Sequence, residues 1–417
     1  MKIVCPQESL ALALSTVGRA VPARSTLPVL GNILLATDSG PTGDSPTSDG
    51  QTATRLKVAA TNLDLGITCW IDAKEVRAPG AITVPARLLS EFVGSLPNAD
   101  VEASLDPRTN VVALTCAGYK ANIKGIDAEE FPPTVVGTSG STIEVNPKLL
   151  HEAIELVVFA AATEDSRPTL TGVLLSFNGS TLTLASADGF RLAVREIALA
   201  EPVEGRQDII VPARALSELA RIIASHREVA PARGAEAPVE SASDESARQS
   251  PVTISMTENR TQVVFRLKDV EIFSRLIEGN FPNYQQIIPT SSNTTMTIDT
   301  KAFQSAIRVA SFFSRETSNV VKLEIVPGGE LDSAQVVVTA ISADVGDSRT
   351  SLDATVVGEA TQVAFNNKFL ADVLAIVPSG QVKLGLNGPS RPGIVTAVGL
   401  EGYTYVMMPM HLNATQR

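Results

Sequence analysis

The residues that most often carry acid–base chemistry are few and scattered in this chain of 417 residues. The three histidines, His151, His226 and His411, are isolated from one another in the sequence. Neighbouring acids such as Glu129–Glu130, or Glu152 with Glu155, are typical of solvated carboxylates. We therefore expect no catalytic residues, although an active site assembled from scattered residues stays open as an alternative.

Short motifs that bind phosphate or activate a nucleophile do not occur. There is no G-x-x-x-x-G-K-[ST] loop, no G-x-G-x-x-G turn, no G-x-S-x-G elbow and no H-E-x-x-H pair. Cys5, Cys69 and Cys116 are odd in number and far apart, which disfavours both a disulfide framework and a zinc site. The sequence thus predicts no cofactor, no metal, and buried thiols in a reducing cytoplasm.

The composition excludes some classes of protein. With 44% hydrophobic and 19% charged residues, the chain cannot be wholly disordered. The net charge of −11 excludes a basic field over the whole surface, but a local basic surface remains compatible with it. No stretch approaches the ~20 apolar residues of a membrane span, so we expect no membrane partner.

The chain contains three copies of one pattern. A β-rich run leads into an amphipathic helix at residues 82–97 (ITVPARLLSEFVGSLP), 209–224 (IIVPARALSELARIIA) and 363–378 (VAFNNKFLADVLAIVP). A short strand precedes a helix at residues 3–21, 143–162 and 296–314, where Asn146 and Thr300 are expected helix caps.

Strand pairs repeat in the same way. Strand–turn–strand patterns occupy residues 56–71, 182–197 and 336–356, and Asp188–Gly189 predicts a hairpin turn. Further β segments lie at residues 119–132, 263–282 and 403–412. The order strand, helix, strands, helix, strands therefore predicts three α+β domains of one design, at residues 1–137, 138–290 and 291–417.

Two segments interrupt the repeat. Residues 37–54 and 227–250 are rich in Gly, Pro, Ser, Ala and acids, and they bury too little apolar area to offset the entropy of ordering. We expect both to be mobile insertions in loops, with a regulatory segment as the alternative.

Basic residues recur on the exposed faces of the predicted helices. In residues 213–224, Leu216, Leu219, Ala220 and Ile223 form an apolar stripe, and the opposite face carries Arg214 and Arg221 two turns apart. The same spacing rule places Arg19, Arg87, Lys148, Lys301, Arg308 and Lys368 outward. One alternative is ordinary solvated charge, and the acids Glu8, Glu91, Glu218 and Asp372 weaken the basic pattern.

Several motifs resemble the bacterial β sliding clamp, the processivity subunit of DNA polymerase III. They are ARSTLPVLGN at 23–32, ITVPAR at 82–87, RPTLTGVLLSF at 167–177, ASADGFRLAV at 185–194, FPNYQQIIP at 281–289 and YVMMPMHL at 405–412. The resemblance covers nearly the whole chain outside the two insertions. It implies a head-to-tail homodimer that closes into a ring around duplex DNA, with helices lining the pore and antiparallel sheets outside.

Such a ring would be held on DNA by topology, so its contacts to the duplex can be weak and independent of base sequence. The resemblance places Arg24 and Arg167 in loops that face DNA. The helix pattern adds further candidates for phosphate contact: Arg214, Arg221, Lys301, Arg308, Arg19, Arg87 and Lys368.

The resemblance also implies a pocket for short peptides of the replicative polymerase, the clamp loader and repair proteins. Its positions here are Leu170, Ala187, Gly189, Phe190, Arg191, Leu192, Pro282, Ile287, Asn366, Phe369, Val406, Met407, Met408, Pro409 and Met410. Methionine adapts to several partners, which suits such a pocket, whereas the alternative is that Met407–Met410 form an ordinary core strand.

The implied dimer contact joins the first domain of one chain to the third domain of the other, where pairing would remove a sheet edge. The matching positions are Lys120, Ala121 and Ile123 on one side, and Phe312, Phe313, Asp344 and Asp347 on the other. Two rivals to a clamp remain: an enzyme with a scattered active site, and a partner-binding scaffold that never touches DNA.

Overall fold

The computed structural model describes residues 1–38, 55–133, 142–164, 166–228, 250–315, 318–329, 333–342 and 344–410. Most of the two predicted insertions, residues 39–54 and 229–249, lies outside this range, as does His411. The chain forms two compact units, one of Met1–Lys148 with Glu218–Leu276 and one of Leu149–Ser217 with Ile277–Arg417.

Unit 1 contains two antiparallel sheets. The larger has the order β10-β13-β14-β15-β4-β3-β2-β6 and the smaller the order β5-β1-β7-β8-β9, with β9 at an edge. The strands of the larger sheet are β2 (Asn32–Asp38), β3 (Arg55–Thr61), β4 (Leu65–Asp72), β6 (Ala81–Pro85), β10 (Ile143–Val145), β13 (Val252–Met256), β14 (Gln262–Leu267) and β15 (Val270–Arg275). Those of the smaller sheet are β1 (Lys2–Pro6), β5 (Glu75–Ala78), β7 (Asp100–Asp106), β8 (Val111–Cys116) and β9 (Tyr119–Lys124).

Unit 2 also contains two antiparallel sheets, with the orders β11-β12-β24-β23-β22-β16-β20 and β19-β18-β17-β21. The first is built from β11 (Gly172–Ala187), β12 (Arg191–Pro212), β16 (Thr294–Asp299), β20 (Thr355–Val357), β22 (Gln381–Leu386), β23 (Gly393–Ala397) and β24 (Tyr403–Met407). The second is built from β17 (Val320–Val326), β18 (Gln335–Ser342), β19 (Gly346–Asp353) and β21 (Thr361–Asn366). Strand β19 lies at an edge.

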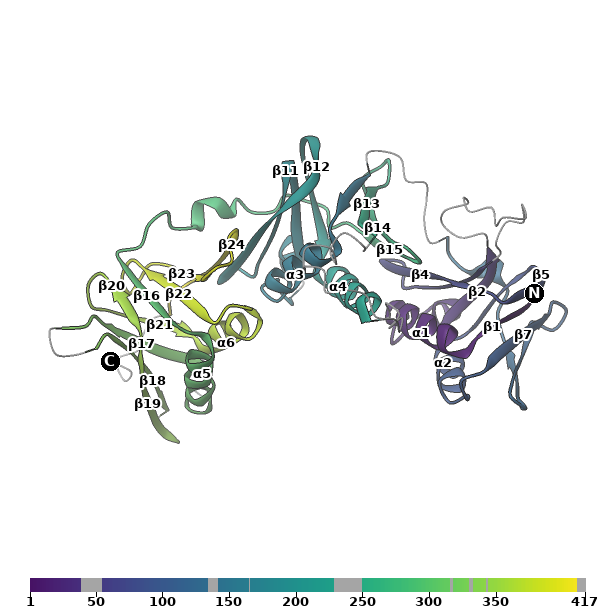
Figure 1. Cartoon of the computed structure of the whole chain (residues 1–417), viewed down its shortest axis with the longest axis horizontal. Coiled ribbons are helices and arrows are strands. Elements are labelled where there is room, and N and C mark those ends of the chain that lie inside the picture. Colours follow the sequence, from purple (N-terminus) through teal and green to yellow (C-terminus); the bar gives the residue numbers. More distant parts are fainter. Residues whose placement is uncertain are drawn as a thin grey trace, which may run out of the picture. The chain divides into compact units, whose positions relative to one another are not determined.

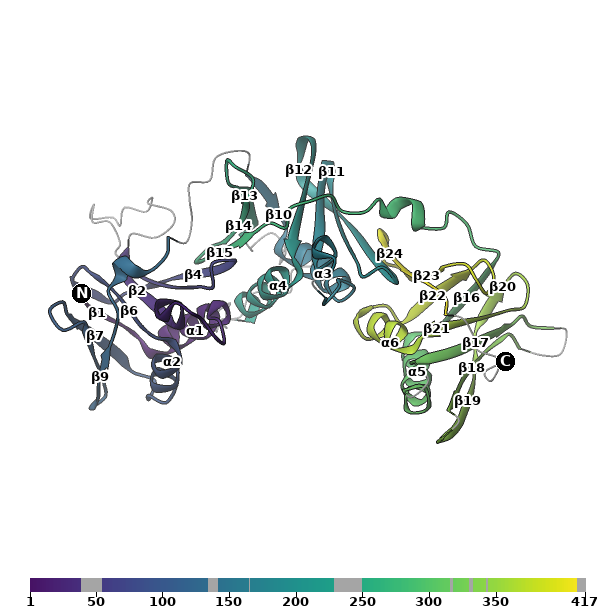
Figure 2. The ribbon, with the colours of Figure 1, turned by 180° about the vertical axis from the view of Figure 1, so that it is seen from behind.

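The helices pack as neighbours on the sheets. Helices α1 (Gln7–Val17) and α2 (Ala86–Gly94) contact each other, as do α5 (Thr300–Ser314) and α6 (Asn367–Ile376). Both pairs lie side by side in Figure 1 and again from behind in Figure 2. Helices α3 (Pro147–Val158) and α4 (Ala213–Glu228) complete the six predicted helices. Short 3₁₀ helices include Gly18–Ala20, Pro28–Gly31, Ala128–Glu130, Pro168–Leu170 and Tyr284–Ile287.

The predicted order of elements is confirmed in all three repeats, and the α+β class with it. The helix stripes are confirmed as well, because Leu216, Leu219, Ala220 and Ile223 of α4 are all buried. The 3.6-residue period succeeds here because each helix covers a sheet with one face only. The turn at Asp188–Gly189 is also confirmed, joining β11 to β12 with Gly189 at a φ of +94°.

Two local predictions were wrong. The cap of α5 is Asp299, whose carboxylate accepts a hydrogen bond from the Ala302 amide at 2.8 Å, whereas Thr300 is the first helical residue and donates its hydroxyl to Ser379 O. The first helix ends before Arg19, which lies in a 3₁₀ turn, although its side chain is exposed as predicted. By contrast, Asn146 accepts from the Lys148 amide, as predicted for a cap.

The three cysteines are free and buried, as expected. Burial raises the pKa of the Cys5 and Cys69 thiols to about 12. Within the described ranges, no helix is both long and apolar enough to span a membrane, and no cluster of His, Cys, Asp and Glu could hold a metal ion.

Candidate functional site

The tip of the β11–β12 hairpin places an aromatic side chain in solvent. Asp188 Oδ1 accepts hydrogen bonds from the Phe190 amide at 2.9 Å and the Arg191 amide at 3.0 Å, which fixes the turn. Glycine suits position 189 because its φ of +94° is a backbone conformation that other residues rarely adopt. The turn leaves Phe190 64% exposed.

Strand β24 brings the methionines beside this tip. It pairs with β12 so that Arg191 faces Met407 and Leu192 faces Val406, and the Met408 amide donates to Phe190 O at 2.8 Å. Met407 is fully buried, whereas Met408 is 41% exposed and follows the last residue of the strand. The core-strand alternative thus holds for Met407 alone, and Met408 lies at a surface with Phe190.

Arg191 connects the hairpin to helix α6. Its Nε lies 2.9 Å from Asp188 and its Nη1 2.6 Å from Asp372 of α6, while its Nη2 donates to Phe159 O at 2.8 Å. The guanidinium carbon lies 4.6 Å from the centroid of the Phe369 ring, and the side chain is only 9% exposed.

The charge of Arg191 is secured by these contacts. Burial opposes the charged form, but the hydrogen bond that Arg191 donates to Asp372 and the nearby Tyr405 and Asp188 groups outweigh burial and raise the pKa of Arg191 above its ordinary value. Arg191 therefore remains a permanent cation that holds two aromatic rings and two carboxylates in place.

Several of the predicted pocket positions support the surface from beneath. Leu192 and Val406 belong to a buried cluster with Tyr284, against which Ala187 packs, and Leu170 is 5% exposed. At the surface, Pro282 is exposed and Ile287 is 46% exposed. Asn366 acts as the cap of α6, since its Oδ1 accepts from the Lys368 amide at 2.9 Å. Pro409 and Met410 are half-buried, and the Met410 amide donates to Ala364 O.

A pocket of about 350 Å³ adjoins this surface. Two cations predicted to contact DNA, Arg167 and Lys368, line it together with Phe190, Arg191 and Phe369 of the predicted peptide site. The sequence reasoning missed Phe159, Asp188 and Asp372 as site residues. In the sequence, Asp188 was recognised only as a turn residue and Asp372 only as an acid on a helix. The pairing of Asp372 with Arg191 could not be predicted, because the two residues are far apart in sequence.

All nine predicted DNA-contact residues lie at the surface. Arg24, Arg167, Arg214, Lys301, Arg308 and Lys368 are exposed. Arg221 lies 2.9 Å and Arg19 3.4 Å from Glu218, and Arg87 lies 2.8 Å from Glu91. The Arg87–Glu91 pair is exposed and such pairs are worth ~1 kcal/mol or less, so Arg87 can exchange its carboxylate for another anion at small cost. Glu218 has a side chain only 11% exposed, so losing Arg19 or Arg221 would leave a buried carboxylate with less compensation.

The predicted dimer residues lie on or beside two edge strands, except Phe312 and Phe313, which belong to helix α5. Lys120 and Ala121 are on the edge strand β9, and Asp347 is on the edge strand β19 with Asp344 just before it. Phe312 of α5 is 60% exposed, with Arg315 over its ring. Ile123 is only 4% exposed, so its side chain packs inside its own unit and only its backbone lies at the edge.

Comparison with known proteins covers nearly the whole chain. Residues 1–135, 144–283 and 285–411 match the N-terminal, central and C-terminal domains of the DNA polymerase III beta subunit. The beta sliding clamp of Synechocystis is 34% identical over 99% of this chain and 100% of its own length, and that of Bacillus subtilis is 28% identical over 98% and 99%.

Solved structures agree with the sequence match. The DNA polymerase sliding clamp of Bacillus subtilis has a TM-score of 0.82 at 27% identity, and the DNA polymerase III beta subunit of Pseudomonas aeruginosa has 0.83 at 23%. Each alignment covers 99% of this chain and 100% of the other. The chain has the three-domain fold of these proteins and belongs to the DNA polymerase III beta subunit, or beta sliding clamp, family.

Proposed function

We propose that this chain is a DNA sliding clamp that closes with a second copy, head to tail, into a ring around duplex DNA. It performs no chemistry itself and tethers the replicative polymerase and other replication and repair proteins, in the cytoplasm where a bacterial chromosome lies. The observation that carries the proposal is the threefold strand–helix repeat matched, domain by domain, by the beta subunit family.

The domain boundaries are part of this proposal. We place them near residues 138 and 290, whereas the family matches end and begin at 135 and 144 and at 283 and 285, so the second boundary lies a few residues inside the C-terminal match. The compact units divide the chain differently, because the ladders β4–β15 and β12–β24 join strands of neighbouring repeats into one sheet. Six such domains in a dimer would give a continuous outer wall.

The basic helix faces supply the weak grip that sliding requires. Arg214, Lys301 and Arg308 are exposed on α4 and α5, where a phosphate can reach them without disturbing the core. Many such contacts, each exchangeable with water or salt, favour retention without fixing a position on the duplex. Arg24 and Arg167 would add contacts from loops.

The surface of Phe190, Met408, Phe369 and Ile287 supports binding of short peptides. It combines the exposed side chains of Phe190, Met408 and Ile287 with the half-buried Phe369 ring, which lies against the buried guanidinium of Arg191. A peptide with hydrophobic anchors would bury these side chains on binding, and Arg167 and Lys368 at the adjoining pocket would favour an acidic neighbour.

Two kinds of DNA separate a clamp from its rivals. After loading by a clamp loader, the protein should remain on closed circular DNA and leave the same molecule once it is cut to a linear form. A scaffold or enzyme that binds DNA only by surface contact would show equal retention on both, and that result would refute the proposal.

Charge removal on helix α4 gives the second arm of the test. Arg214→Ser with Arg221→Ser should reduce loading or retention on circles several-fold at physiological salt, and less at low salt. Arg391→Ser, an exposed arginine of unit 2 outside the predicted contacts, is the matched control and should leave retention unchanged. If the double variant were loaded and retained as well as the wild type, Arg214 and Arg221 would not be DNA contacts.

A further inference from the structure

Two seams between repeats have the same construction. In the first, β4 pairs with β15 under α1, and in the second, β12 pairs with β24 under α3. Asn62 Oδ1 accepts from the amides of Asp64 and Leu65, just as Asp188 Oδ1 accepts from those of Phe190 and Arg191. Both β4 and β12 therefore start after the same three-residue turn.

The equivalence continues along both ladders. Four residues into each strand, Cys69 faces Val270 and Arg195 faces Tyr403. One residue further, the Trp70 amide donates to Asp269 O at 2.9 Å, and the Glu196 amide donates to Gly402 O at 2.8 Å. Position by position, Cys69 corresponds to Arg195, Val270 to Tyr403, and Asp269 to Gly402.

The second seam is filled by its own large side chains. Arg195 is 8% and Tyr403 2% exposed, and the Arg195 guanidinium donates to Glu401 O in the β23–β24 turn. Burial lowers the pKa of Arg195, while the negative charge of Glu152 on α3 acts in the opposite sense. An arginine and a tyrosine thus occupy the space under α3.

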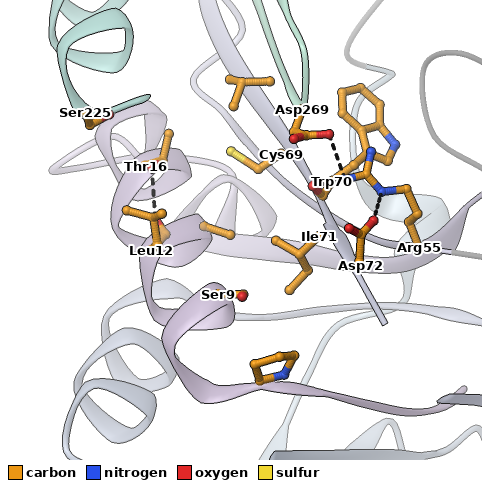
Figure 3. Close-up of a pocket in the computed structure, with 13 residues that line it drawn as sticks. Ser9, Leu12, Thr16, Arg55, Cys69, Trp70, Ile71, Asp72, Ser225 and Asp269 are labelled. Atoms are coloured by element: carbon orange, nitrogen blue, oxygen red, sulfur yellow. Dashed lines mark hydrogen bonds and ion pairs between the residues drawn. The ribbon is translucent and has the colours of Figure 1, made fainter. Parts of the chain in front are cut away.

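The first seam is hollow at the corresponding place. A cavity of about 290 Å³ lies between α1 and the β4–β15 ladder, lined by Ser9, Leu12 and Thr16 of α1 and by Cys69, Ile71 and Val270 of the ladder. Figure 3 shows Ser9 and Thr16 on the helix, with Cys69 and Ile71 on the side of β4 toward it. The cavity exists because the first seam has smaller side chains at the equivalent positions. Cys69, Val270 and Ser9 replace Arg195, Tyr403 and Leu149 of the second seam.

The wall of this cavity carries an acid that its counterpart lacks. Asp269 stands where the second seam has Gly402, and its Oδ1 lies 2.7 Å from Arg55 Nη2. Its side chain remains 33% exposed, and Arg55 also contacts Asp72 at 2.7 Å, so two carboxylates share one guanidinium. The cavity end near β15 therefore has a net negative charge.

We propose that the first seam binds an arginine side chain from a peptide of a partner protein, in the space that Arg195 fills in the second seam. The aliphatic stem would pack on Leu12 and Ile71, and the guanidinium would meet the carboxylate of Asp269. The site belongs to unit 1 alone, so it does not depend on ring closure or on peptide binding at Phe190.

The single tryptophan of the chain makes this testable, since Trp70 lines the cavity. The probe is the peptide acetyl-Gly-Arg-Gly-amide, titrated into the full chain with Trp70 fluorescence and the Trp70 indole NMR signal as readouts. The matched probe replaces arginine by citrulline, which is nearly the same shape without charge. We expect saturable binding of the arginine peptide and at least about tenfold weaker binding of the citrulline peptide.

Two kinds of variant locate the site. Asp269→Asn should weaken the arginine peptide about tenfold and leave the citrulline peptide unchanged. Cys69→Arg, which copies the second seam, should abolish binding of both, and Ser9→Leu provides a milder filling if that variant folds poorly. Ser166→Leu, in the pocket of unit 2, is the control and should bind normally.

Three results would overturn the proposal. They are no saturable response of Trp70 to the arginine peptide, equal affinity for the arginine and citrulline peptides, or undiminished binding to the well-folded Ser9→Leu variant. Retention on circular DNA is measured separately, so failure here leaves the clamp function untouched, and failure of the clamp function leaves this site testable.

Discussion

At the scale of single residues, Arg191 has the largest concentration of contacts in the candidate peptide site. It bridges Asp188 of the hairpin and Asp372 of α6 and stacks on Phe369, with little solvent around it. Removing one member of such a buried set leaves the other charges without compensation, which costs more than the set contributes as a whole.

Arg191→Ala should lower the free energy of unfolding by about 3 kcal/mol and weaken binding of a hydrophobic partner peptide at least about tenfold. Urea unfolding and peptide titration measure the two effects. Arg191→Lys keeps the charge but not the planar fork, and should recover only part of either. Arg206→Ala, an exposed ion-paired arginine, is the control, and a loss as large there would contradict the role of Arg191.

Cys69 provides a pH-dependent prediction. Its pKa in the folded chain is about 12, above the ordinary value of 9.0, because burial and Asp269 disfavour the thiolate. The unfolded chain loses this proton first as pH rises. The stability contributed by the protonated thiol is therefore full below pH 9.0 and is lost between there and about 12.

In urea unfolding series from pH 8 to pH 11, the wild type should lose up to about 1.4 kcal/mol more per pH unit than Cys69→Ala above the ordinary thiol pKa. Cys69→Ala provides the baseline for the wild type, because the other groups titrate equally in both chains. Parallel curves would show that the thiol ionises as easily in the folded chain as in the unfolded one.

At the scale of elements, helix caps explain both a success and a failure of the sequence reasoning. The apolar stripe located α5, but the strand and helix meet at Asp299-Thr300, where either side chain is a good cap by type. The backbone at Asp299 is extended (φ −60°, ψ 126°) and Thr300 is already helical, so only the structure could distinguish them.

Asp299→Ala should destabilise unit 2 by about 1 kcal/mol, whereas Asp299→Asn should cost only a few tenths, because asparagine keeps the accepting oxygen. Thermal unfolding of the full chain monitors the difference. Exposed Asp353→Ala, outside any helix, is the control. Equal effects of the alanine and asparagine substitutions would mean that the charge rather than the hydrogen bond matters.

The same contrast applies to the candidate sites. Periodicity predicted which helix faces are buried, because a buried stripe is a local property of the sequence. It could not predict that Glu218 would meet Arg19, or that Asp372 would meet Arg191, since these pairs are 199 and 181 residues apart. Partners of this kind depend on which strands pair, and no short segment of the sequence determines strand pairing.

At the scale of the whole molecule, strand pairing between repeats determines which segments belong to each compact unit. Strand β15 of the second repeat joins β4 of the first, and β24 of the third joins β12 of the second. Strands β9 and β19 are two of the strands that lie at the ends of their sheets. The first carries Lys120 and Lys124, and the second carries Asp347, Arg349 and Asp353. A net positive edge would therefore meet a net negative one if two chains paired there.

Lys120→Glu or Asp347→Lys alone should shift the dimer toward monomer, and the two changes together should restore it, because the charge pair is then reversed. Light scattering after size-exclusion chromatography gives the mass. Lys383→Glu, exposed on β22 away from both edges, is the control. A double variant no better than the singles would argue against direct pairing of these edges.

The two edge strands β9 and β19 differ in sequence and charge, and this difference has a consequence for assembly. A contact between two different patches leaves one patch of each kind free, so further subunits can add. The assembly closes into a ring if the rotations between subunits sum to a full turn, and otherwise grows into a filament. A substitution that altered the turn between successive copies by a few degrees would leave every local contact intact and still convert closed particles into fibres, visible by electron microscopy.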